Sequence, residues 1–218
     1  MQFLWGIAHL THFPPFDNLP KSFADFLIAH VSAKVAQKTE QNIWNGAAAT
    51  NGEFGGFRET LLADGDVTDV GAGAAVTSAN VIAKIGLVVD AIGSSLYTSE
   101  DMYIYVSQNV ARAYVRALGG FATNIGAAGV NQDGTQWYTG GTLSFDGIKI
   151  AVANGLADNT MVAAEKSNLF FGTGLLSDQN EVKVIDMADI DGSQNVRVVM
   201  RFSAGIQHGI GSDIVLYS

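Results

Sequence analysis

The residues best placed for metal chemistry are two histidines near the N-terminus, His9 and His12, three positions apart. Two imidazoles at this spacing can hold a zinc ion, but a protein zinc site needs three or four protein ligands. The chain has no cysteine, and no further ligand has a fixed relation to the pair. Because the surrounding segment is apolar, we interpret both histidines as packing or capping residues and predict no metal and no cofactor.

Three aspartates form a second candidate site. Asp64, Asp66 and Asp69 are spaced as in half of a calcium-binding loop. The complete loop also needs a glycine at its sixth position and a glutamate at its twelfth, and this sequence has neither. We therefore expect a hydrated acidic turn here.

Two glycine-rich turns are candidates for phosphate binding. Gly71 and Gly73 follow no predicted strand, no third glycine completes the dinucleotide fingerprint, and no lysine follows as in a P-loop. Gly172 and Gly174 lack the same features. The sequence therefore predicts no nucleotide site in either turn.

The remaining polar residues do not form a recognisable catalytic group. No serine stands in a Gly-x-Ser-x-Gly elbow, and neither His30 nor His208 has a recognisable nucleophile as partner. Asp189 and Asp191 have the right chemistry for an acid and a base, but in glycine-rich sequence such a pair is typical of a hydrated turn. We predict no catalytic residues and no enzyme.

Helical periodicity dominates the first half of the chain. Ser22 can cap a long helix with Asp25 three residues later, and Gly46 ends it after Trp44. Apolar residues at a 3.6-residue period predict two further helices, with a short apolar strand between them. The predicted helices cover residues 22–44, 81–92 and 109–118, and the strand covers 102–106.

Beyond Gly120 the sequence is typical of β-structure, with Gly, Asn and Thr turns between short apolar runs. Residues 64–73 are expected to form a loop. Helices early and strands late predict an α+β fold. The predicted strands cover residues 147–152, 161–164, 182–187, 196–202 and 214–217.

Composition limits the class of function. The 218 residues carry a net charge of −9, and only 15% of them are charged. A protein whose main task is to bind the phosphate backbone needs clustered positive charge. The acidity therefore favours a protein that encloses nucleic acid over one that binds it directly. Residues 1–10 show no signal-peptide pattern, and the apolar helix at 81–92 is too short to span a bilayer, so we expect no membrane association.

Several segments, in order, resemble one known family. The long helix closes on Glu40–Gly46, small residues follow, and Phe54–Phe57 contains two glycines. A helix, an apolar strand leading to a serine and another helix come next. Together with Phe145–Ile148, Asn168–Thr173 and the final strands at 198–217, these pieces are similar to the major capsid proteins of tailed double-stranded DNA bacteriophages.

The resemblance implies the Hong Kong 97-like capsid fold, with a peripheral domain that holds the long spine helix and an axial domain. Residues 1–19 are then an N-terminal arm and 20–218 the capsid domain. Within it, 20–75 would be mainly peripheral, 76–165 mainly axial and 166–218 the closing strands.

The function implied is that of a structural subunit, which assembles in the host cytoplasm into pentamers and hexamers of an icosahedral virion capsid. The shell would enclose double-stranded DNA without reading its sequence. Portal, scaffolding and decoration proteins are candidate partners.

Two departures from the family pattern affect these expectations. Members usually carry an extended hairpin before the spine helix, so the arm at 1–19 is either a shortened substitute or the remainder after upstream sequence is removed. The hairpin lysine that forms isopeptide cross-links in one member has no counterpart in 1–19. The alternative functions are an encapsulin-like compartment shell and a small α+β enzyme or binding domain.

Overall fold

The computed structural model divides the chain into two compact units, one of Met1–Ala36 with Lys183–Val199 and one of Gln37–Val182 with Met200–Ser218. The arm predicted over 1–19, with His9 and His12, lies outside the described residues, as do Gly73, Asp189 and Asp191. The residues described are 23–50, 52–71, 75–118, 143–174, 182–186, 192, 196–200 and 203–218.

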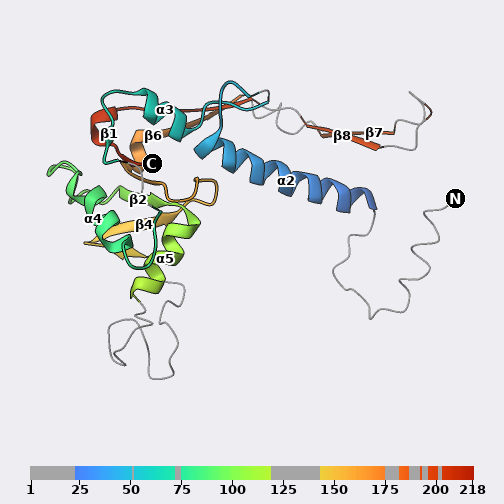
Figure 1. The fold of residues 1–218 in the computed structure, drawn as a ribbon. Coiled ribbons are helices and arrows are strands. Elements are labelled where there is room, and N and C mark those ends of the chain that lie inside the picture. Colours follow the sequence, from blue (N-terminus) through green and yellow to red (C-terminus); the bar gives the residue numbers. More distant parts are fainter. Residues whose placement is uncertain are drawn as a thin grey trace, which may run out of the picture. The chain divides into compact units, whose positions relative to one another are not determined.

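All three predicted helices are confirmed (Figure 1). The first, α2 (Phe23–Asn45), is continuous over 23 residues. The second, α4 (Val81–Asp90), ends two residues before its predicted stop, because Ala91 already caps it. The third, α5 (Gln108–Leu118), begins one residue early.

The larger unit is built on a six-stranded sheet with the order β1-β10-β5-β2-β4-β3. At its centre, β2 (Met102–Val106) runs antiparallel to β5 (Met161–Glu165) and parallel to β4 (Ile148–Val152). The C-terminal strand β10 (Val215–Tyr217) pairs with β5. Short strands close the two edges of the sheet: β1 (Thr68–Asp69) and β3 (Ser144–Phe145).

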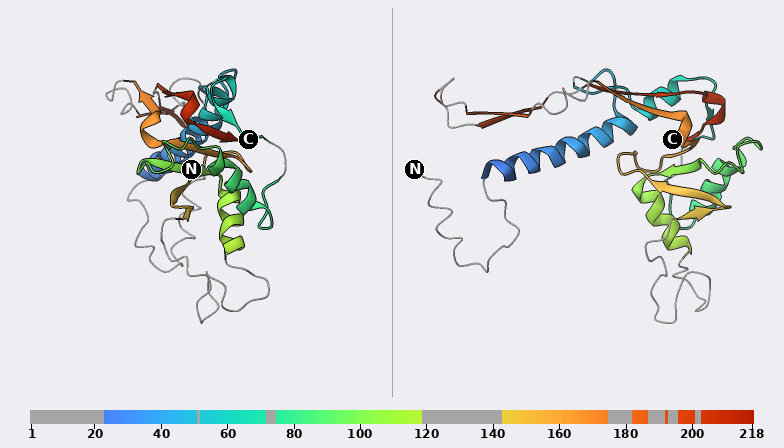
Figure 2. Two further views of the ribbon diagram at one scale, coloured as in Figure 1. Left: turned by 90° about the vertical axis from the view of Figure 1, so that its left-hand side faces the viewer. Right: turned by 180° about the vertical axis from the view of Figure 1, so that it is seen from behind.

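Both faces of this sheet are covered, which explains why β5 is a continuous apolar run. On one face, α4 and α5 pack against Met161 and Ala163 of β5. On the other, the C-terminal end of α2 and the short helix α3 (Phe57–Ala63) pack against Val162 and Ala164. The helices therefore form layers on either side of the strands (Figures 1 and 2).

Glycines allow the end of α2 to lie close to its neighbours. A Cβ on Gly46 would overlap the carbonyl oxygens of Phe54 and Asn42, and a Cβ on Gly155 would overlap the carbonyl of Glu40. Close backbone approach of this kind is open only to glycine. It brings Trp44 into the core, 5.4 Å from the Phe57 ring and 5.2 Å from the Tyr105 ring between centroids.

The predicted loop at 64–73 is wrong in part, because it contains β1. Thr68 donates its backbone N–H to Ile214 at 3.1 Å, and Val70 donates to Leu216 at 2.9 Å. The strand exists through pairing with the far end of the chain, which local composition does not show. The helix α3 was also not predicted, whereas the strand at 204–208 falls within the final strands at 198–217 that the resemblance implies.

The described residues also form two separate two-stranded ribbons outside the six-stranded sheet. In the first, β6 (Leu169–Thr173) runs antiparallel to β9 (Ala204–His208). In the second, β7 (Val182–Asp186) pairs with β8 (Val196–Met200), at two of the predicted strands. The whole is an α+β fold, as the sequence predicted.

Candidate functional site

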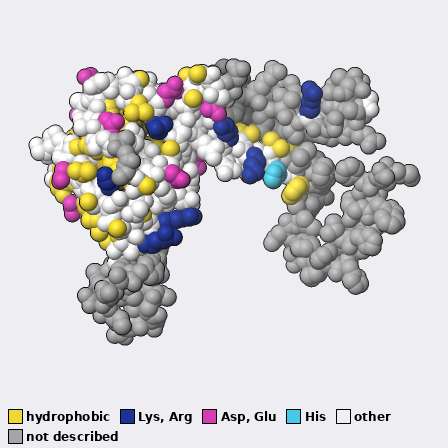
Figure 3. Space-filling view, viewed as in Figure 1, with side chains coloured by type: hydrophobic (Ala, Val, Ile, Leu, Met, Phe, Trp, Pro, Cys, Tyr) yellow, Lys and Arg dark blue, Asp and Glu magenta, His cyan; other side chains and the backbone are white. Residues whose placement is uncertain are grey.

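The outer face of α4 carries two large apolar side chains that are open to solvent, beside the exposed Asp90. Ile82 and Leu87 are each 48% exposed, and Ala83 and Gly86 lie between them on the same side. Large apolar side chains that gather on an exposed surface are typical of contact sites. On the side of the body where Figure 1 places α4, Figure 3 shows apolar side chains reaching the surface. This face therefore has the character of a contact surface.

The ribbon of β6 and β9 exposes aromatic side chains on both faces. Phe170 is 54% exposed and Phe171 is 48% exposed. Successive residues of a strand point to opposite faces, so no single layer of this subunit could cover both rings. At the base of the ribbon His208 is buried and its partner Leu169 is half-buried, whereas the other residues of β6 are exposed.

The outer edges of this ribbon carry backbone groups that no described strand pairs. Just beyond the two ends of β6, the Gly174 N–H donates to the Ser203 carbonyl and the Gly209 N–H donates to the Asn168 carbonyl. Because hydrogen-bonded pairs alternate along antiparallel strands, the even-numbered residues of β6 form the hydrogen-bonded pairs with β9. The N–H and C=O groups of Phe171 on one edge, and of Ile206 on the other, consequently point outward. Such edges are templates for pairing with another chain.

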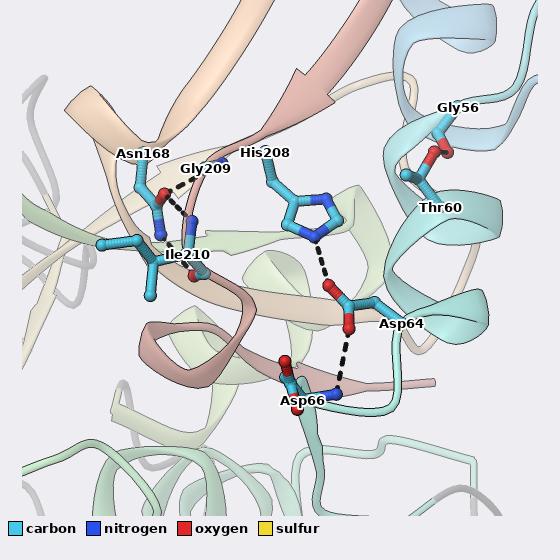
Figure 4. A network of polar contacts seen from close by, with 8 residues as sticks. All are labelled: Gly56, Thr60, Asp64, Asp66, Asn168, His208, Gly209 and Ile210. Atoms are coloured by element: carbon cyan, nitrogen blue, oxygen red, sulfur yellow. Dashed lines mark hydrogen bonds and ion pairs between the residues drawn. The ribbon is translucent and has the colours of Figure 1, made fainter.

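A buried asparagine fixes the base of the ribbon (Figure 4). The side-chain oxygen of Asn168 accepts hydrogen bonds from the backbone N–H groups of Gly209 at 3.1 Å and Ile210 at 2.7 Å. Its amide nitrogen donates to the Ile210 carbonyl at 2.8 Å. The side chain replaces strand pairing where β6 and β9 separate, so the ribbon leaves the body in a defined direction.

A second contact joins β9 to the end of α3. The His208 ring is buried, and its Nε2 lies 2.7 Å from the Asp64 carboxylate (Figure 4). The Asp66 backbone N–H donates to the same carboxylate at 3.0 Å. The Asp66 hydrogen bond, and after it the His208 ring, lower the pKa of Asp64 below its ordinary value. His208 Nδ1 is buried with no partner among the described residues, so the ring holds its place through Nε2 alone.

The sequence did not predict this pair. Asp64 and His208 are 144 positions apart, and each was interpreted without the other. Asp64 is not simply a hydrated turn residue, because it anchors a buried imidazole. The exposed Asp69 accepts a hydrogen bond from the Gly71 N–H at 3.0 Å, as a turn residue does. No group of three metal-binding side chains occurs in the part of the chain that the structure describes.

The other candidate residues lie apart from one another. His30 is exposed on α2, with its ring centroid 6.1 Å from that of Phe26. Gly172 lies inside β6 and Gly174 directly after it, so neither belongs to a loop before a helix. None of the described helices is long and apolar enough to cross a membrane.

A hollow of 620 Å³ is lined by residues 97–100 and Met102 on one side and by residues 146–149 on the other. The Tyr97 hydroxyl donates to the Asp146 carbonyl at 2.9 Å, and the Lys149 ammonium lies 5.7 Å from the centre of the Tyr103 ring. The first contact joins the two loops and the second joins β4 to β2, while Ser99 of the same hollow donates its hydroxyl to the Glu165 carboxylate at 2.6 Å.

Comparison with known proteins identifies the fold. Neither a protein-family model nor a curated protein sequence matches the chain. Among solved structures, the procapsid of satellite phage P4 with its size determination protein is similar to all of the chain at 7% identity, with a TM-score of 0.60. The capsid of an empty GTA particle covers 92% of the chain at 12% identity, with a TM-score of 0.57.

A structure from Mycobacterium phage Che8 covers 90% of the chain at 15% identity, also with a TM-score of 0.57. The chain spans 63% of the length of that protein, 67% of the GTA protein and 71% of the P4 protein. Together with the helix-covered sheet and the long helix α2, these likenesses show that the chain has the Hong Kong 97-like fold of phage capsid proteins.

Proposed function

We propose that the chain is the structural subunit of an icosahedral phage capsid and has no catalytic role. The observation that carries this proposal is the β6–β9 ribbon, which exposes phenylalanines on both faces and unpaired backbone on both edges. An isolated two-stranded ribbon is only marginally stable in water, and further strands or a covering layer stabilise it. Copies of the same chain are the covering layer that a capsid fold provides.

The exposed face of α4 supports the same proposal. The opposite side of α4 is already buried in the core of the subunit. Ile82 and Leu87 would therefore become buried only if another molecule packed against them. Burial of apolar surface contributes roughly 25 cal/mol per Å², so many repeated contacts of modest size hold a shell together. Two separate apolar surfaces on one subunit also suit an assembly in which each copy has several neighbours.

The enclosed polymer would be double-stranded DNA, held without sequence-specific contacts. A net charge of −9 opposes adhesion of the phosphate backbone to the wall. Assembly in the host cytoplasm and residence in the virion follow from this role. We also propose the division into an arm at 1–19, a mainly peripheral part at 20–75, a mainly axial part at 76–165 and closing strands at 166–218.

Particle mass tests the proposal directly. The full chain is expressed, purified and examined by light scattering and negative-stain microscopy over a range of salt and protein concentration. We expect pentamers, hexamers or closed particles. A protein that stays at the subunit mass of 23.0 kDa under all conditions would contradict the proposal and favour the small enzyme or binding domain.

The content of the particles separates the two kinds of shell. Particles from the natural source are treated with nuclease, opened and assayed for protected nucleic acid. Protected double-stranded DNA supports the capsid, whereas a protein cargo without DNA supports an encapsulin-like compartment.

A further inference from the structure

Two glycines of the ribbon have no explanation among the described residues of the subunit. At Gly209 an added Cβ would overlap the Asn168 side-chain oxygen, which two hydrogen bonds hold in place, and at Gly174 it would displace the Ser203 hydroxyl. At Gly172 a Cβ would meet only the Gly205 carbonyl oxygen at 3.9 Å, which is an ordinary contact. At Gly205 it would meet no described atom within 4 Å.

The backbone does not require these glycines either. Gly172 and Gly205 lie inside β6 and β9, and neither has the positive φ that favours glycine. Glycine inside a strand weakens it, because the residue has more freedom to lose and no side chain to pack. Glycine in a strand often marks a place where another backbone or a ligand approaches closely.

The strand register places both glycines at one spot. Gly172 is the direct partner of Gly205, so the pair leaves a patch with no side chain on one face of the ribbon. Phe170 and Gln207 are the next pair on the same face. The Phe170 ring lies against Gly209, with its Cε2 3.3 Å from the position of a Cβ there, and remains 54% exposed. A projecting ring thus stands beside a flat patch.

The chemistry of this face selects the kind of partner. Neither β6 nor β9 contains Lys, Arg, Asp or Glu, so the face offers no cation to a phosphate backbone. A projecting ring and a flat patch of similar width are complementary to each other. A surface that carries both is complementary to a second copy of itself turned through a two-fold axis.

We propose that this face is a contact between two copies of the chain, in which Phe170 of each copy packs over the Gly172–Gly205 pair of the other. The proposal rests on the proposed shell function and adds to it the surface through which neighbouring subunits meet. The glycines allow the partner's aromatic ring to reach the backbone, and each ring loses its contact with water.

Valine substitutions test the contact in the full-length protein. G172V and G205V each fill the flat patch, and no described atom lies closer than 3.9 Å to the added Cβ at either position. Valine also favours strands, so we expect the melting temperature of the unassembled subunit to stay the same or rise. We expect the assembled fraction to fall about tenfold or more. T173V, on the exposed opposite face of β6, is the control and should assemble like the wild type.

The outcomes distinguish this contact from the shell function itself. Normal assembly of both valine variants would overturn the proposed contact and leave the shell function standing. Failure of the wild type to assemble would overturn the shell function. A valine variant that loses its cooperative melt would show that the subunit's own fold requires the glycine, which also overturns the inference.

Discussion

The His208–Asp64 contact shows how one residue pair can set the position of a strand. His208 belongs to β9, Asp64 caps the end of α3, and no other charged contact between these two elements is recorded among the described residues. Because the imidazole is buried, its removal would leave a space as well as an unpaired carboxylate. The pair therefore joins the ribbon to the body of the subunit.

The pH dependence of stability should reveal this pair. The pKa of Asp64 in the folded state lies below its ordinary value of 3.8. The ionised carboxylate therefore stabilises the fold above pH 3.8, and this contribution is lost as the pH falls through the lower folded-state pKa. We expect D64N to lower the melting temperature at neutral pH and to make little difference in strong acid.

Thermal unfolding measured from neutral pH to about pH 1 checks this, with D66N as the control because Asp66 contributes only its backbone to the network. A constant difference between D64N and wild type over the whole range would contradict the assignment.

The glycines that pack against the C-terminal end of α2 give a second prediction for single residues. A Cβ on Gly155 overlaps the Glu40 carbonyl, and one on Gly56 overlaps the Asn42 carbonyl. Since both obstacles are backbone atoms, G155A and G56A should each lower the free energy of unfolding by about 1–3 kcal/mol, as overpacking does. Urea denaturation checks this. G65A, with no described atom near its added methyl, should change stability little.

Among the elements, strong local patterns were predictable and long-range pairings were not. The strand at 102–106 and the helices around it combine apolar periodicity with clear stop residues, and the structure confirms them. β1 is only two residues long and depends on hydrogen bonds to Ile214 and Leu216, which no local signal shows. The same holds for the site, because Asp64 meets His208 only after α3 and β9 have packed.

The exposed helix face supports a prediction for α4. Gly86 lies in the middle of this helix, has no described atom near the position of a Cβ, and lacks a positive φ. Alanine is about 1 kcal/mol more favourable than glycine inside a helix, so G86A should raise the free energy of unfolding of the unassembled subunit by roughly that amount. Urea denaturation measures it, and a destabilised G86A subunit would show that Gly86 serves the subunit's own packing.

The whole molecule combines a well-packed body with surfaces that its own chain leaves open. The sheet is buried on both faces, whereas α4 and the β6–β9 ribbon expose large apolar side chains. This contrast is the physical reason to expect assembly. Composition had indicated it only weakly, because any folded chain exposes much apolar surface.

The arm at residues 1–19 should serve assembly more than folding. It is unusually rich in aromatic residues and contains Pro14 and Pro15, which preclude a continuous helix. Aromatic side chains bury large areas and frequently anchor interfaces. The aromatic residues concerned are Phe3, Trp5, Phe13 and Phe16.

Deletion of residues 1–19 tests the arm, with thermal melting and particle yield measured on the same preparation. Among the described residues, the buried side chains that cover both faces of the sheet come from 44–217. We therefore expect the truncated chain to keep a cooperative melt and to lose most of its particles. If the melt itself disappears, the aromatic residues belong to the subunit's own core. If particles form normally, the arm does not hold neighbouring subunits together.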